Sequence, residues 1–570
     1  MFARESGLSL LAKLSDSACF MPFGPAEGAV HMRWHIPIFG MASVILLAVV
    51  VVYAGSLNAP FVFDDDNFFS VPETVSRYGH LHVGLRALSY ATLSWTVDWF
   101  GLDAFWLRLG NVLLHAANAI ALFFLLRRLF QVTLVDAAES DIGRSTLARF
   151  AFLGAMLFAL HPVAIYSVVY LIQRSTLMAT LFVLLMLIAY LEGLVRGGWY
   201  WMLAAALCYF AAVFSKEHSI MAPGLALSLT FLIRKPSTTL LKQTALYYIL
   251  ILFASVTALV VFGNRGIIGQ VYEPHALTML DLFAKMHGLV GLTDLPNVHL
   301  LSIFTQSTLF FKYLGLWLLP NPGWMSVDMR EPFALSLFSW PHTFGLFAFL
   351  SYFCVAVWLL FKRGKAGLLG FALIFPWILF LTEFSTVRIQ EPFVLYRSYL
   401  WMPGLFAVLP VAFGLLRPAR TYVLLCALCL LLIPLTLNRL NTFSTPLLLW
   451  DDAEKLVRDK PYAIGVERIY YSRGTELGYF KRYEEAIADF NKGIAAHPFD
   501  LLYYGRGTAL FNLGRYLEAL RDYGRAIATK SDNPKYYIGR ALTYRALGDL
   551  HASQKDFMKA CELGSCQKDL

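Results

Sequence analysis

Long runs of apolar residues, separated by short polar connectors, constrain this chain more than any other feature. A helix needs about 20 mostly apolar residues to cross a membrane, and about eleven segments reach or approach that length. Hydrophobic residues make up 58% of the chain and charged residues 15%, which is too apolar for an ordinary soluble protein. The sequence therefore predicts an all-α, polytopic bundle of membrane helices. The predicted spans are 36–56, 106–126, 149–170, 174–193, 199–214, 218–233, 244–262, 341–361, 367–382, 399–416 and 420–437.

The distribution of lysine and arginine predicts which way these helices run. Cytoplasmic loops of membrane proteins are enriched in both residues, and the rule is satisfied if the segment 1–35 is cytoplasmic and the first helix is retained. The segment 304–320, which contains Lys312, is then an interfacial or re-entrant helix, because one more span would move the basic cluster 362–365 across the membrane. The net charge of +9 is accounted for by these loops and predicts no nucleic-acid binding.

The same topology places the polar motifs of the membrane domain, residues 36–437, on the extracytoplasmic side. Two long loops, 57–105 and 263–340, lie on that side. Polar groups in or beside membrane segments are costly unless they are hydrated, paired or used in chemistry. Because all of the candidate motifs fall on one face, we expect a single extracytoplasmic site.

Three consecutive carboxylates, Asp64, Asp65 and Asp66, follow the first predicted helix and a Phe-Val-Phe segment at 61–63. The aromatic residues are expected to hold the acids against the bilayer, and burial raises a carboxylate pKa toward the range of a general base. A solvated connector is the alternative interpretation. The pattern favours one of the three acids as the base that deprotonates a hydroxyl, without selecting among them.

Three cations lie at the extracytoplasmic ends of later apolar segments: Arg174, Lys216 and Arg397. Arginine binds a phosphate as a fork and lysine as a point charge, so all three are candidates to bind the phosphate of a lipid-linked donor. Snorkelling toward lipid headgroups is the alternative interpretation. Six further residues are supporting candidates: His161, Gln173, Glu217, His218, Arg388 and Tyr399.

The glycine, metal-ligand and cysteine patterns indicate which cofactors and disulfides to expect. The sequence has no phosphate-binding glycine loop and no spacing of metal-ligating residues, so we expect no cofactor, with a divalent metal ion left open. Four cysteines lie within apolar runs and are expected to fill the core. The last two, Cys561 and Cys566, either form a disulfide in an oxidising compartment or remain a pair of free thiols.

A change to a charged, soluble composition at residue 438 marks a second domain, 438–570. Within it, small and aromatic residues recur at spacings of 33 and 34 residues, as in the register of Gly474, Gly507 and Ala541. This period is typical of tetratricopeptide repeats, in which aromatic residues wedge between helices. The sequence predicts an extracytoplasmic α-solenoid of three repeats. They are expected at about 467–500, 501–533 and 534–567.

Seven short motifs occur in a characteristic order along the chain. They are Phe-Val-Phe-Asp-Asp at 61–65, Leu-Arg-Ala-Leu-Ser at 85–89, Phe-Ala-Leu-His-Pro at 158–162, Gln-Arg at 173–174, Ser-Lys-Glu at 215–217, Phe-Lys-Tyr-Leu at 311–314 and Tyr-Arg-Ser-Tyr at 396–399. With the terminal repeats, this order resembles that of the transmembrane and tetratricopeptide-repeat O-mannosyltransferases and their bacterial relatives. Those proteins belong to the GT-C superfamily of membrane glycosyltransferases.

The resemblance implies a GT-C fold, a polyprenyl-phosphate-linked sugar as donor, and inversion at the sugar carbon in the first extracytoplasmic loop. The acid of the family falls on Asp64 or Asp65, and its basic positions fall on Arg174, Lys216 and Arg397. The chain departs from the family directly before Arg397, where relatives tend to have an acid and this chain has Leu-Tyr. That departure puts an ion pair from this position in doubt.

We therefore expect a glycosyltransferase that moves a sugar to a hydroxyl of an exported protein, with the repeats binding the acceptor. The resemblance implies a multi-pass protein of the bacterial inner membrane whose site and repeats face the periplasm. One alternative keeps the fold and changes the acceptor to a lipid or a cell-wall glycan. Another is a membrane-anchored scaffold for envelope assembly that has no enzymatic activity, in which the acids and cations are dispensable.

Overall fold

The computed structural model describes residues 37–80, 84–263, 272–273, 276–286, 288, 297–414, 418–460 and 463–566. The chain divides into a compact unit at Ala42–Leu570 and a short unit at Met1–Met41. The predicted N-terminal segment 1–35 and the parts 264–271, 274–275, 287 and 289–296 of the loop 263–340 lie outside the described residues. Within the described part, almost all secondary structure is helical, and extended pairing is confined to two isolated bridges. The predicted all-α class is confirmed.

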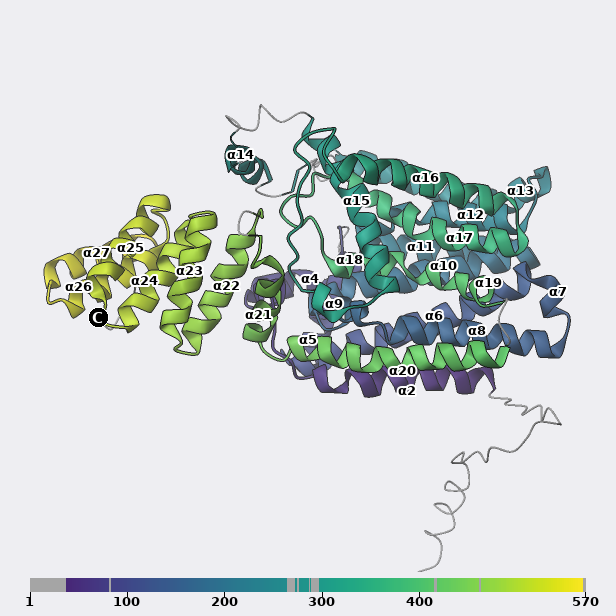
Figure 1. Ribbon diagram of the computed structural model, residues 1–570, viewed down its shortest axis with the longest axis horizontal. Helices are drawn as coiled ribbons and strands as arrows, with labels where there is room; N and C mark the ends of the chain where they lie inside the picture. Colours follow the sequence, from purple (N-terminus) through teal and green to yellow (C-terminus); the bar gives the residue numbers. More distant parts are fainter. Residues whose placement is uncertain are drawn as a thin grey trace, which may run out of the picture. The chain divides into compact units, whose positions relative to one another are not determined.

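Seven helices in the described part are long and apolar enough to cross a membrane, so the chain is a multi-pass membrane protein. They are built on α2 (Ile38–Tyr53), α6 (Ala104–Thr133), α10 (Arg174–Arg196), α13 (Thr238–Gly263), α16 (His342–Phe361), α17 (Gly364–Phe380) and α20 (Pro418–Thr442) (Figure 1). An eighth candidate is a broken one, in which α8 (Asp141–Ala159) meets the segment Pro162–Val168 at a bend of 50°.

The predicted count of eleven spans is not confirmed. The three other apolar segments form shorter helices: α11 (Trp199–Ser215), a 3-10 turn with α12 (Ala222–Ile233), and a 3-10 turn with α19 (Leu409–Ala412). Apolar composition identified these segments, but it does not show where the helices break. The bend after α8 illustrates the reason, because Pro162 lacks the amide hydrogen that would continue the helix.

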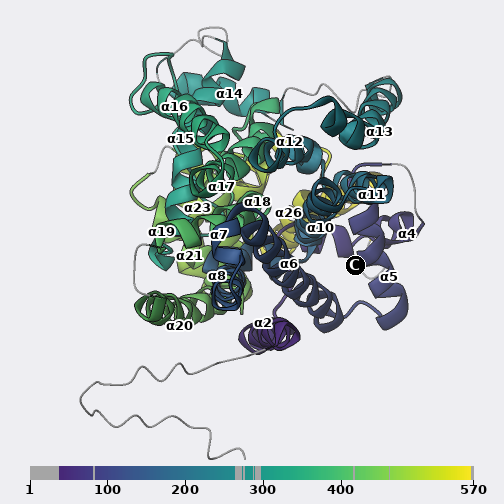
Figure 2. The ribbon, with the colours of Figure 1, turned by 90° about the vertical axis from the view of Figure 1, so that its right-hand side faces the viewer.

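Three of the long helices form the buried centre of the bundle. Protein encloses 61% of the apolar stretch of α6, 72% of that of α10 and 67% of that of α17, against 17% for α13 and 22% for α16. Figure 2 looks along the bundle and shows α6 and α10 inside it, with α13 at its margin. The exposed apolar faces of α13 and α16 are therefore the surfaces suited to lipid chains.

The polar face of α6 joins neighbouring helices. The side-chain amides of Asn111 and Asn118 donate to backbone carbonyls in the segment 168–177, at 2.9 to 3.3 Å. The His115 ring lies between the hydroxyl of Tyr399, 2.7 Å from Nδ1, and a backbone carbonyl of α8, 2.9 Å from Nε2. These side chains are buried, and their hydrogen bonds connect α6 to the neighbouring helices.

The segment predicted to be interfacial forms α15 (Val298–Leu318), which is not among the seven helices above. Lys312 on α15 pairs with Glu331. Around the acidic loop the chain forms α3 (Asp64–Phe69), α4 (Pro72–Gly79) and α5 (Ala87–Phe100). The remaining membrane-domain helices are α7 (Val135–Ala138), α9 (Ile165–Val168), α14 (Ala276–Met286) and α18 (Leu395–Trp401).

Three helical hairpins follow a leading helix, α21 (Pro446–Val457), at the C-terminal end of the chain. The hairpins are α22 (Val466–Tyr479) with α23 (Tyr483–Ala496), α24 (Asp500–Asn512) with α25 (Tyr516–Thr529), and α26 (Pro534–Ala546) with α27 (Leu550–Glu562). Small residues permit their close contacts, since a Cβ on Gly474 would lie 2.9 Å from the Phe490 ring. The chain ends near a disulfide that joins Cys561 to Cys566, with Cα atoms 4.3 Å apart.

An ion pair repeats in the hairpins, and the sequence alignment did not single it out. In each hairpin an arginine on the first helix forks onto an aspartate on the second, with N–O distances of 2.6 to 2.9 Å. The pairs are Arg473–Asp489, Arg506–Asp522 and Arg540–Asp556. All three aspartates are buried, so each pair is a bidentate, charge-assisted contact that fixes the angle between the two helices.

Breaking the Arg506–Asp522 pair should destabilise its hairpin more than breaking an exposed ion pair of the same hairpin. We expect Arg506→Ala to lower the local opening free energy of α24 and α25 by about 1.5 to 3 kcal/mol, because Asp522 loses a charged partner while buried. The matched control is Arg515→Ala, whose equally short pair with Glu518 is exposed, so its loss should change the opening free energy much less. Amide hydrogen exchange of the full chain measures both, and equal effects would contradict the prediction.

Candidate active site

The acidic loop is held by aromatic residues, as the Phe-Val-Phe segment predicts. Phe61 stacks on Phe69 of α3 with ring centroids 5.3 Å apart, and Val62 is buried. Phe63 has a φ of 56°, a left-handed conformation that turns the chain sharply into α3. Because this turn precedes a helix, the consecutive acids that open α3 point in different directions.

The Asp65 side chain points inward and connects the acidic loop to the 3-10 turn at Leu171–Gln173. Its carboxylate accepts hydrogen bonds from the backbone amides of Leu171 at 3.2 Å and Ile172 at 3.0 Å, and it lies near the Arg108 guanidinium. Burial raises the pKa of Asp65 to about 7, although both amides and Arg108 oppose that rise. A carboxylate that is fully buried and occupied by backbone donors has no room for a substrate hydroxyl, so Asp65 positions the loop.

Asp64 points outward and is exposed. The hydroxyl of Tyr170 donates to its Oδ2 at 3.0 Å, and the Asp64 backbone amide is 3.3 Å from the same hydroxyl. Asp64 therefore presents an accessible carboxylate in a fixed orientation. The backbone of Asp66 belongs to α3, and its side chain lies outside the described structure.

Lys216 lies between α11 and the following 3-10 turn, and its ammonium group is buried. It donates to the side-chain oxygens of Gln173 at 3.0 Å and Thr176 at 2.6 Å, and it sits 5.2 Å from the centre of the Tyr396 ring. Both bonded oxygens are uncharged, and no described carboxylate lies within ion-pairing distance. Burial, together with the charge of Arg86, lowers the pKa of Lys216 to about 7.

Arg397 is surrounded by carboxylates. One of its nitrogens donates to Glu383 at 3.0 Å, and another lies 3.6 Å from Glu391. Arg388 pairs with the same Glu383 at 3.2 Å and with Glu273 at 3.0 Å. Burial alone would lower the pKa of Arg397, but the charge of Glu383 outweighs it and raises that pKa well above its usual value. The acid missing directly before Arg397 is thus replaced by acids from other segments.

Arg174 is buried, and every one of its nitrogens is occupied by the protein. It donates to Asn111 at 2.8 Å, to the Leu107 carbonyl at 2.6 Å and to two oxygens of α5 at 3.0 Å. Gly110 leaves room for it, since a Cβ there would lie 2.8 Å from a guanidinium nitrogen. This guanidinium joins α5, α6 and α10, and four of its five N–H groups are used by these bonds.

Of the six supporting candidates, Arg388 belongs with the ion pairs around Glu383, and the other five separate into two groups. His161 stacks on Trp317 at 4.2 Å and lies 3.1 Å from the carbonyl of the same residue, and Tyr399 bonds to His115, so both are structural. The second group surrounds Lys216: Gln173 accepts its hydrogen bond, Glu217 pairs with Arg86, and His218 lies 3.2 Å from Glu383. In the described chain, no group of three or more potential ligands is arranged to bind a metal.

Two tyrosines connect the acid to the cations, and the sequence analysis missed both. Tyr170 donates to Asp64, and its ring centroid lies 6.1 Å from that of Tyr396. The Lys216 ammonium lies 5.2 Å from the centre of the Tyr396 ring. Arg86, which forks onto Glu217, was also missed, although it lies within the Leu-Arg-Ala-Leu-Ser motif. Asp64 and Lys216 therefore belong to one connected cluster at one end of the bundle.

The leading helices of the C-terminal hairpins contact this cluster directly. Trp450 of α21 packs against Phe63 with ring centroids 4.7 Å apart. Arg468 of α22 lies 4.9 Å above the same Phe63 ring and 3.3 Å from Glu391. The residue before Asp64 is thus fixed by the repeat segment.

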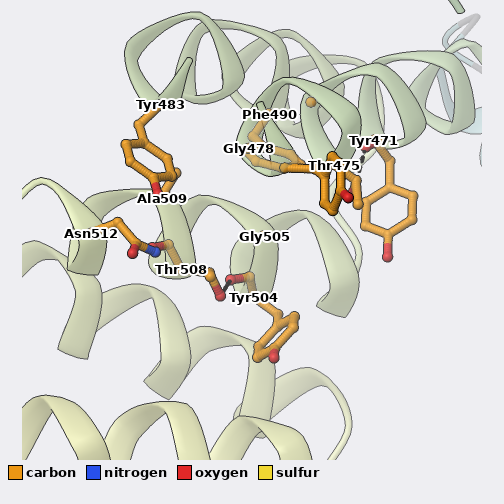
Figure 3. Close-up of a pocket in the computed structure, with 12 residues that line it drawn as sticks. Tyr471, Thr475, Gly478, Tyr483, Phe490, Tyr504, Gly505, Thr508, Ala509 and Asn512 are labelled. Atoms are coloured by element: carbon orange, nitrogen blue, oxygen red, sulfur yellow. Dashed lines mark hydrogen bonds between the residues drawn. The ribbon is translucent and has the colours of Figure 1, made fainter. Parts of the chain in front are cut away.

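A groove of about 280 Å³ lies farther along the hairpins, between α22 and α24. Uncharged side chains line it, including Tyr471, Thr475, Tyr504, Thr508 and Asn512, and Figure 3 shows these hydroxyl and amide groups around the hollow. Such a surface offers stacking and neutral hydrogen bonds rather than charge.

Comparisons with known proteins found a matching family model and a related protein. A family model described as a tetratricopeptide repeat matches residues 534–563, which contain α26 and α27. The chain is 25% identical over 319 residues to the protein O-mannosyl-transferase TMTC2 from Homo sapiens. The match covers 49% of this chain and 34% of that protein, so this chain aligns with about a third of the relative's length. The resemblance indicated by the motif order is confirmed.

Proposed function

Starting from that likeness, we propose that this chain is a membrane glycosyltransferase that moves a sugar from a polyprenyl-phosphate donor to a hydroxyl of an exported protein. One observation carries the proposal: an accessible carboxylate, Asp64, and a buried ammonium without a carboxylate partner, Lys216, lie in one cluster. The reaction needs a base for the acceptor and a cation for the departing phosphate. The cluster contains one candidate for each.

In the proposed reaction, Asp64 takes the proton of the acceptor hydroxyl as that oxygen bonds to the anomeric carbon. The bond between the anomeric carbon and the phosphate oxygen breaks, and its electron pair leaves with the lipid phosphate. Attack from the side opposite the phosphate inverts the configuration at that carbon. Tyr170 holds Asp64 in place, and Asp65 fixes the loop against the 3-10 turn at Leu171–Gln173.

Lys216 is the phosphate contact that the charges favour. Arg86, Arg388 and Arg397 all have carboxylate partners, whereas Lys216 is bonded to uncharged oxygens. An incoming phosphate supplies the missing negative charge and is stabilised most as its charge grows in the transition state. We assign Arg397 and Arg174 to positioning, because their nitrogens are engaged by the protein.

Donor use is expected to weaken above neutral pH. Lys216 is protonated below its pKa of about 7 and loses its charge as the pH rises through that value. We expect kcat/KM for the donor to fall about tenfold per pH unit above 7, because this parameter reports ionisations of the free enzyme. In Lys216→Met this decline is absent, and kcat/KM stays low. Lys312→Met, which removes a paired lysine of α15, keeps the decline.

The acceptor side of the proposal rests on the repeat segment. Its leading helices contact the residue before Asp64, and the grooves of helical repeats typically bind polypeptide, which favours a polypeptide acceptor over a lipid or glycan. The basic loops favour a cytoplasmic position for the other end of the bundle, so we propose that the cluster faces the periplasm.

Transfer by the purified full chain tests the function. The assay supplies a polyprenyl-phosphate sugar with either a hydroxyl-containing peptide or a lipid acceptor, and intact masses of exported proteins are compared with and without the gene. Sugar on the peptide and on exported proteins supports the proposal. Transfer to the lipid alone favours the glycan alternative. Two results together favour the scaffold alternative. Exported proteins keep their mass, and envelope assembly fails only when the repeats are removed.

A further inference from the structure

A second groove lies between α6 and α10, toward the end of the bundle away from the acidic loop. Apolar side chains line most of it, among them Ala117, Phe124, Leu181 and Leu185, and its volume is about 690 Å³. Leu185 is exposed, so the groove opens onto the apolar outer surface. A membrane-embedded groove of this kind suits a hydrocarbon chain.

The end of this groove is positively charged. Arg127, Arg128 and Arg196 line it, and Glu192 is the one carboxylate among the lining residues. Glu192 pairs with two of these arginines, since its oxygens lie 2.6 Å from Nε of Arg128 and 2.6 Å from Nε of Arg196. No carboxylate of the described chain pairs with Arg127. Three arginines and one glutamate leave an excess of two positive charges.

We propose that this groove binds an anionic phospholipid of the surrounding bilayer, with an acyl chain along the apolar wall and the phosphate at Arg127. The two parts of such a lipid match the two parts of the groove, and basic pockets between membrane helices bind anionic headgroups. A zwitterionic lipid adds a positive group to a region with excess positive charge, so it binds less well.

The groove is separate from the sugar-transfer cluster. Arg127 follows Arg108 by 19 positions on α6, which places it about 28 Å farther along the helix axis at 1.5 Å per residue. Figure 1 shows α7, which follows α6, at the end of the bundle opposite α9 and α21. The lipid therefore occupies a different membrane leaflet from the proposed donor phosphate.

Lipid retention by the purified full chain tests this site. The protein in neutral detergent receives equal amounts of phosphatidylglycerol, which is anionic, and phosphatidylcholine, which is zwitterionic, and native mass spectrometry counts the bound lipids. We expect the wild type to retain phosphatidylglycerol preferentially. Arg127→Gln should weaken that retention about fivefold, the effect of one basic residue near a charged headgroup. Ala117→Phe should reduce retention of both lipids by filling the apolar wall.

The matched control is Arg144→Gln, which removes an exposed arginine of α8 paired with Asp141. It should retain phosphatidylglycerol like the wild type. Equal retention of the two lipids by the wild type overturns the proposal and needs no variant to be folded. Equal effects of Arg127→Gln and Arg144→Gln overturn it as well. Displacement of phosphatidylglycerol by polyprenyl phosphate, mole for mole, also overturns it, because the groove would then belong to the sugar donor.

Discussion

Replacement of Asp64 with asparagine is expected to lower kcat for sugar transfer by about 100- to 10,000-fold, which is the contribution of a positioned general base. Asparagine has nearly the same shape, and the hydroxyl of Tyr170 can still donate to its side-chain oxygen. The amide cannot accept the proton of the acceptor hydroxyl. KM for the donor should therefore change little, since Lys216 and its neighbours are intact. Steady-state transfer to a hydroxyl peptide measures both parameters.

Two further acids supply the controls for this prediction. Asp65→Asn should mainly lower the thermal stability, because the asparagine side chain replaces a carboxylate that accepts from two backbone amides. Asp98→Asn changes an exposed acid of α5 and should leave transfer unchanged. Full activity in Asp64→Asn together with none in folded Asp65→Asn would move the base to Asp65. Full activity in both variants would end the hypothesis of a base in this loop.

Loss of the Arg397 guanidinium is expected to be the most destabilising single change near the site. Breaking a buried ion pair costs about 3 to 5 kcal/mol, because the remaining charge is left in a medium of low dielectric constant. Arg397→Met keeps much of the side-chain length and leaves Glu383, which is fully buried, with Arg388 and His218 as its remaining partners. We expect the lower end of that range for this reason. Unfolding of the full chain in a denaturing detergent series measures the loss.

A second substitution separates lost charge pairing from lost packing. In Arg397→Met with Glu383→Gln, the buried carboxylate is also neutralised, so part of the stability should return. Arg144→Ala is the exposed control and should cost about 0.2 to 1 kcal/mol at most. A double variant no more stable than Arg397→Met would show that packing, and not the ion pair, accounts for the loss.

The cations show how far the sequence could predict the candidate site. Arg174 and Lys216 have the same signature in the sequence, a basic residue at the end of an apolar run. In the fold, the Arg174 guanidinium is occupied by α5 and α6, whereas Lys216 meets only uncharged oxygens. The partners of Arg174 precede it by more than 60 positions, so no local pattern reports them.

The span count is not confirmed for a related reason. Apolar composition identifies a segment that leaves water, but the length of each helix depends on where it bends and on what packs against it. The runs at 199–214 and 218–233 are as apolar as a span, but their helices, Trp199–Ser215 and Glu217–Ile233, are shorter than the seven long ones, and Lys216 lies between them. The polar break between these two helices is the feature that places Lys216 beside Gln173 and Thr176.

The sequence by itself determined that this is an all-α membrane chain with repeats and an acidic loop, because hydropathy and period are local properties of the residues. Only the tertiary structure decided which aspartate faces outward. Asp64 and Asp65 are neighbours, yet Tyr170 holds one at the surface while the amides of Leu171 and Ile172 take the other into the core. These partners follow the acids by more than 100 positions, and a carboxylate turns toward the donors that the folded chain brings to it.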